Sequence, residues 1–149
     1  MAGRCFTIGV FQDVSWAGRG LDALARHGFP AESLSVIAKD SSDARALIAA
    51  HLKGEPTGLT IEAIGPAVVR GPLVDELQGS AADLASTGIA GTINRAGFQK
   101  HDGVIFERLT ARGGVLVAVH NEPRAAEALA TLHAYGGGNA AIGAWSGRV

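Results

Sequence analysis

A pattern of strand, polar turn, amphipathic helix, glycine and second strand occurs twice in this chain, and it constrains the fold more than any single motif does. The first copy spans residues 6–39 and the second spans residues 114–145. Aligning Gly28 with Gly136 also pairs Ile8 with Leu116, Val10 with Ala118, Asp13 with Asn121, Leu21 with Leu129, and Leu24 with Leu132. Two βαβ units in series are typical of a ferredoxin-like α+β sandwich. We therefore expect an α+β fold in which both units contribute to one sheet.

Local signals place the elements of each unit. In the first, β-branched and aromatic residues predict a strand at 5–11, Asp13 or Ser15 caps a helix at 16–27, Gly28 ends it, and a strand follows at 34–38. In the second, we expect a strand at 115–119, a helix capped by Asn121 that ends near residue 135, and a last strand at 140–145.

The segment between the units, residues 41–113, is too long for a plain loop and must carry its own structure. Helical spacing of apolar residues predicts helices at 42–52, 81–95 and 99–112. The apolar run at 64–74 contains two Gly-Pro pairs, which we interpret as a turn and the start of a helix that ends near residue 78. We therefore expect a single domain of 149 residues in which residues 41–113 form a mainly helical insertion.

Charge and cysteine content exclude several classes of protein. The formal net charge is −1 and the basic residues are scattered, so nucleic acid is not an expected partner. The uncharged run at 84–94 is too short to span a bilayer, and the apolar run before Asp13 is too short for a signal peptide. Cys5 is the only cysteine and cannot form an intrachain disulfide. We expect a cytoplasmic protein without a membrane role.

The predicted strands are apolar on both faces, which suggests assembly. Successive side chains of a strand point to opposite faces, and neither face is polar. The two unit helices cover one face, so the other needs the inserted helices or another subunit. Burying four such side chains is worth on the order of 6–12 kcal/mol before entropy losses. We expect a dimer or larger homo-oligomer, with another protein as an alternative partner, through Thr7, Phe11, Val115, Val117 and Val119.

Equivalent polar turns in the two units are the candidate ligand site. Both turns lead into helix N-termini, whose free N–H groups can hold an anion, although simple capping also explains these residues. The candidates are Gln12, Asp13 and Ser15 in the first turn, and His120, Asn121 and Glu122 in the second.

Catalytic and metal-binding patterns are weak. No histidine pair has the spacing of a helical zinc site, although His101, His120 and Glu122 are ligand types in separate segments that could converge. No serine lies in a nucleophile-elbow context. We expect no catalytic residues, no metal and no cofactor.

The order of several segments resembles a known family. These segments are Ala63-Ile64-Gly65-Pro66-Ala67-Val68-Val69 with Gly71-Pro72-Leu73, then Gly88-Ile89-Ala90-Gly91, then Phe106-Glu107-Arg108-Leu109 leading into Gly113-Gly114-Val115-Leu116-Val117. Together with the opening βαβ unit, they resemble the bacterial general stress protein 17M-like family. The resemblance implies a small, stress-associated, non-enzymatic protein and brings no catalytic residues. Unlike typical members, this chain carries charges in its middle segment, including Arg70, Asp75 and Glu76.

These observations favour a non-catalytic, stress-associated protein that acts as a self-assembling structural or interaction module. A regulatory module that senses a small ligand at the paired turns is one alternative. A small enzyme or metal-binding protein is the other.

Overall fold

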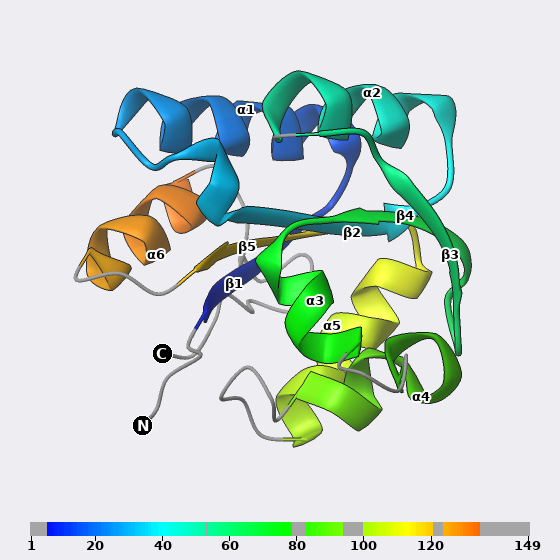
Figure 1. Ribbon diagram of the computed structural model, residues 1–149. Coiled ribbons are helices and arrows are strands. Elements are labelled where there is room, and N and C mark those ends of the chain that lie inside the picture. Colours follow the sequence, from blue (N-terminus) through cyan, green and yellow to red (C-terminus); the bar gives the residue numbers. More distant parts are fainter. Residues whose placement is uncertain (1–5, 53, 79–82, 94–99, 121–123, 135–149) are drawn as a thin grey trace.

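The protein has an α+β fold in which one antiparallel sheet lies between two layers of helices (Figure 1). The computed structural model describes residues 6–52, 54–78, 83–93, 100–120 and 124–134. The sheet has the order β1-β5-β2-β4-β3, and its strands are β1 (Phe6–Phe11), β2 (Leu34–Lys39), β3 (Thr57–Ile61), β4 (Gly65–Arg70) and β5 (Val115–His120). Every neighbouring pair is antiparallel.

Helices cover both faces of this sheet (Figure 1). One layer contains α1 (Val14–Arg26), α2 (Ser42–His51) and α6 (Ala125–Ala134). The other contains α3 (Pro72–Gln78), α4 (Asp83–Thr92) and α5 (Lys100–Ala111). A short 3₁₀ turn, η1 (Ala31–Ser33), leads into β2.

The repeat is visible in the register of β1 against β5. Ile8 pairs with Ala118, and the residues aligned with them in the repeat, Leu116 and Val10, also pair with each other. Gly9 pairs with Val117, its own equivalent under the same alignment. The ladder is therefore symmetric about the Gly9–Val117 pair, as a two-fold relation between the units requires. Both units contribute to one sheet, as expected.

The first unit forms close to its predicted limits because its caps are correctly placed. The Asp13 carboxylate accepts a hydrogen bond of 2.9 Å from the Trp16 N–H and starts α1. Gly28 follows the helix with a φ of +86°, a conformation that glycine adopts without strain. Ser41 caps α2 by accepting from the Ala44 N–H at 3.0 Å, directly before the predicted beginning of this helix at residue 42.

A β-hairpin in the insertion was not predicted. The first Gly-Pro pair of the 64–74 run does not make a plain turn, because Gly65 and Pro66 are the first two residues of β4 and Thr60 of β3 pairs with Pro66. A proline is tolerated at the beginning of a strand, where it interrupts few ladder hydrogen bonds. The second pair does start a helix, since α3 begins at Pro72. Residues 41–113 therefore contribute helices and two strands.

The proposed oligomer face is wrong, because this chain covers it. The side chains of Phe11, Val115, Val117 and Val119 are buried in a core with residues of α1, α2 and α6, and Thr7 is also buried. The opposite face, which includes Ile8, Val10 and Leu116, packs in a second core with residues of α3, α4 and α5. The unit helices α1 and α6, together with α2, therefore cover the face that was expected to be the interface, and the inserted helices α3, α4 and α5 cover the other face.

Helix α4 is broken at Gly88, which has a φ of +78°. The Glu107 carboxylate of α5 accepts a hydrogen bond of 3.2 Å from the Ala90 N–H just after the break. A carboxylate at this place satisfies a donor that the break leaves without a helical partner. Two segments quoted for the family resemblance are therefore in contact.

Part of the second unit lies outside the described residues. Its strand and helix are present as β5 and α6, and Leu132 of α6 is buried in the same core as its repeat equivalent, Leu24 of α1. The predicted cap Asn121 and the predicted strand at 140–145 are not among the described residues.

Candidate functional site

The two polar turns proposed as a ligand site lie at opposite ends of the sheet. Antiparallel pairing places Phe11 opposite Val115 and Phe6 opposite His120, so the end of β1 is far from the end of β5. Five residue steps along a strand correspond to roughly 17 Å. Equivalent positions in the repeat are therefore not neighbours in space, and the two turns do not form one site.

Each turn has a local structural role in the described part of the chain. Asp13 caps α1, and Gln12 and Ser15 beside it are exposed. The His120 ring lies 5.0 Å from the Phe6 ring between centroids, across the ladder from it. Asn121 and Glu122 lie outside the described residues.

The residues considered for a metal site do not converge where the structure describes them. His101 and Asp102 are adjacent in the first turn of α5, with 3.9 Å between the His101 Nε2 and the Asp102 Oδ1, whereas His120 ends β5. Within the described ranges, no three histidine, cysteine, aspartate or glutamate side chains are grouped so that they could hold a metal ion.

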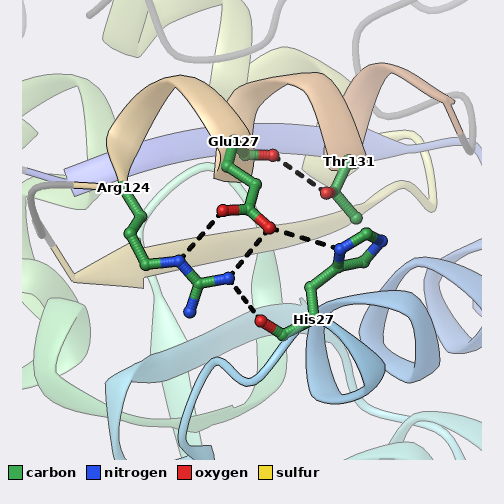
Figure 2. A network of polar contacts seen from close by, with 4 residues as sticks. All are labelled: His27, Arg124, Glu127 and Thr131. Carbon is green, nitrogen blue, oxygen red and sulfur yellow. Dashed lines mark hydrogen bonds and ion pairs between the residues drawn. The ribbon is translucent and has the colours of Figure 1, made fainter.

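A polar network joins the helices of the two units (Figure 2). The Arg124 guanidinium donates to both carboxylate oxygens of Glu127, at 3.0 and 2.8 Å, and to the carbonyl oxygen of His27. The His27 Nδ1 lies 3.3 Å from the same carboxylate. Arg124 also stacks over the Phe29 ring at 4.2 Å from its centroid.

This network has a structural role and does not form a binding site. The hydrogen bond from Arg124 is the main cause that holds the pKa of Glu127 below its ordinary value. Thr131 completes the group by donating to the Glu127 carbonyl oxygen at 2.9 Å. These contacts connect the end of α1 to the beginning of α6. Each of the four side chains of Figure 2 makes at least one hydrogen bond or ion pair within the chain.

A cleft of about 570 Å³ lies at the end of the sheet where β3 begins and β4 ends. We call it the Arg70 cleft. Its volume lies within the range of small-molecule sites. The cleft is lined by residues of η1, β3, β4 and α3, by the first residue of β2, and by Leu52, which follows α2.

The exposed lining of the Arg70 cleft is almost as polar as it is apolar. The lining includes four buried apolar side chains and two partly exposed ones. The buried ones are Leu34, Leu52, Val69 and Val74, and the partly exposed ones are Leu59 and Pro72. The polar side chains on its lining are Glu32, Thr57, Arg70, Asp75 and Gln78. Apolar side chains and polar groups that line one cleft together can bind a small organic molecule that has both kinds of surface.

Two close approaches of the backbone shape the cleft. Gly71 has a φ of +114°, and a β-carbon there would lie 2.6 Å from the Ser35 α-carbon. Ser35 accepts a buried hydrogen bond of 2.9 Å from the Leu73 N–H, which ties the beginning of α3 to β2. At the other side, the Arg70 guanidinium lies against Gly54, where a β-carbon would collide with it.

The sequence interpretation did not identify this cleft. Its residues come from four separate stretches of the chain, at 31–34, 52, 57–59 and 69–78, and Arg70 was noted only as a charge within an apolar region. The available signal was a single cation that ends a β-branched run directly before Gly71-Pro72. That signal becomes informative only when β4 is recognised as a strand.

Helices of the described segments are too short or too polar to cross a membrane. In comparisons with protein-family models, curated proteins and solved structures, no match to this chain was found.

Proposed function

We propose that this protein is a non-catalytic binding module that holds a small organic ligand in the Arg70 cleft. The observation that carries the proposal is the cleft itself, with its volume of about 570 Å³ and a lining that combines apolar and polar side chains. The proposal keeps the ligand-sensing alternative of the sequence analysis but moves its site away from the paired turns. Stress association and a cytoplasmic location stay predictions from the resemblance and the single cysteine.

Thr57 provides a direct test, because its exposed side chain lines the cleft. The probe is N-phenyl-1-naphthylamine, an uncharged fluorophore whose emission rises in apolar surroundings. We expect saturable binding with one probe per chain. A Thr57→Trp variant fills the cleft and should weaken binding at least tenfold.

Thr60→Trp is the matched control. Thr60 lies on the same strand and is also exposed, but its side chain points to the opposite face and does not line the cleft. Equal probe binding by wild type and both variants would contradict the proposal, as would a signal that never saturates.

Self-association is a second candidate function, and the observation that favours it is the edge strand β3. This strand ends the sheet in the described part of the chain, and Thr57, Gly58 and Thr60 are exposed on it. Edge strands with free backbone groups can pair with a second copy. Light scattering after size exclusion tests this candidate, since Thr60→Lys should lower the mass of any dimer and leave a monomer unchanged.

The ferredoxin-like arrangement is proposed for the fold. Strand β5 lies between β1 and β2 and is antiparallel to both, which supports a split βαβ first unit. The arrangement also requires the segment at 140–145 to pair with β1. An experimental structure with this segment elsewhere would contradict it.

A further inference from the structure

Arg70 gives the cleft a chemical preference beyond its shape. It is the last residue of β4 and pairs with Val36 of β2, so its backbone is fixed by the sheet. Its side chain is partly buried, and the guanidinium is positioned against the glycine at 54. A guanidinium has five N–H donors in a planar fork and suits two-point binding of a carboxylate.

The other charges in the cleft limit what the ligand can carry. Glu32 and Asp75 are exposed carboxylates on its lining. Exposed charges are screened by water and salt more than a partly buried one, so they oppose a single anionic group at Arg70 only weakly. Each additional negative charge on a ligand would add to the repulsion from these carboxylates.

The apolar part of the lining favours an apolar body for the rest of the ligand. Leu52, Leu59 and Val74 come from three different elements and line the cleft together with Arg70. An extended hydrocarbon body can cover this surface and remove it from water, which is favourable in proportion to the apolar area buried.

We propose that the ligand of the Arg70 cleft is an amphiphile with one negative charge, whose acid group binds Arg70 and whose apolar body lies along the cleft walls. This inference rests on the proposed function of the cleft. It adds the charge and the orientation of the ligand.

A series of ten-carbon probes that differ only in the head group tests the inference. Decanoate, decanol and decylamine are each used below their micelle-forming concentrations at pH 7.5, and each displaces N-phenyl-1-naphthylamine from the full chain. A hydrogen bond to a charged group is worth enough to change affinity by tenfold or more. We expect decanoate to bind at least tenfold more tightly than decanol and decylamine, and ATP not to compete.

Two arginine variants locate the effect. Arg70→Gln should remove the preference for decanoate over decanol, while Arg70→Lys should retain part of it, because lysine keeps the charge but loses the fork. Arg45→Gln is the matched control: it removes the same charge from an exposed residue of α2 that pairs with Asp40 and does not line the cleft. That variant should keep the full preference.

Each outcome is decisive. If decanol binds as well as decanoate and Thr57→Trp blocks both, the cleft is a binding site and the inference about charge is wrong. Tighter binding of decylamine, or an equal loss in Arg45→Gln, also overturns it. If no probe binds, the proposed function fails together with the inference. The head-group comparison uses the wild-type chain, so it is informative even if Arg70→Gln does not fold.

Discussion

At the residue scale, Gly71 is the position where a single methyl group should do most damage to the cleft. A β-carbon there would collide with Leu34 and Ser35 of β2, and the φ of +114° is unfavourable for any other residue. We expect Gly71→Ala to lower the free energy of unfolding by more than the roughly 1–2 kcal/mol that a left-handed backbone conformation costs a non-glycine residue.

Gly113→Ala is the control for backbone conformation alone, since Gly113 has a φ of +105° and no atom lies within 4 Å of the added β-carbon. Urea unfolding measures both variants. Equal losses of stability would show that the close approach to β2 contributes nothing.

Glu127 predicts a pH dependence of stability. Its pKa is lowered in the folded protein, first by the hydrogen bond from Arg124 and further by the charges of Arg124 and His27. A lowered pKa means that the contribution is complete above the ordinary glutamate pKa of about 4.3 and is lost as pH falls through the lower folded value. Glu127→Gln should therefore reduce the urea midpoint at pH 6, and the difference from wild type should shrink toward pH 3.

Glu55→Gln removes one carboxylate from an exposed position outside the network and serves as the control. The difference in urea midpoint between Glu55→Gln and wild type should not shrink in the same way from pH 6 to pH 3. A Glu127→Gln midpoint that stays parallel to wild type down to pH 3 would show that the ion pairs of Figure 2 do not contribute to folding.

At the scale of elements, a buried hydrogen bond adds to the packing that holds α3 against the sheet. Ser35 accepts from the Leu73 N–H, and removing the hydroxyl leaves a buried donor without a partner. We expect Ser35→Ala to cost about 1–3 kcal/mol and to increase amide exchange in α3. It should also weaken probe binding, because α3 forms one wall of the cleft.

Ser41→Ala is a useful comparison, because Ser41 accepts a hydrogen bond from a residue only three positions away at the start of α2. Its cost should be about 1 kcal/mol, with faster exchange limited to α2. Exchange in α3 that is unchanged by Ser35→Ala would contradict the role given to Ser35.

Elements with local signals were predictable from the sequence. Helix α1 begins at its Asp13 cap and is followed by Gly28, because both signals act within a few residues of the helix. The hairpin was not predictable in this way. Gly65 and Pro66 usually interrupt structure, and only pairing with β3 and β2 makes residues 65–70 a strand. Tertiary context here overrides local preference.

At the scale of the whole molecule, the repeat correctly predicted that the two units share a sheet, but the two turns that it relates do not form one site. A two-fold relation about the Gly9–Val117 pair sends equivalent turns to opposite ends of the sheet. The cleft arises instead where the insertion and the first unit meet, and Leu34, Leu52 and Arg70 are among the residues that line it. Neither the insertion nor the first unit contains a recognisable site motif by itself, so the periodicity of the sequence could not reveal the cleft.

The two helix layers also change what the apolar strands predict about assembly. Val117 is fully buried between β5 and the layer of α1, α2 and α6, so its contribution belongs to folding and not to an interface. Val117→Ala should lower the free energy of unfolding by about 2 kcal/mol, measured by urea unfolding. Its mass by light scattering should equal that of wild type in conditions where both are folded. A variant that keeps the wild-type urea midpoint but has a smaller mass would show that this layer separates to form an interface between copies.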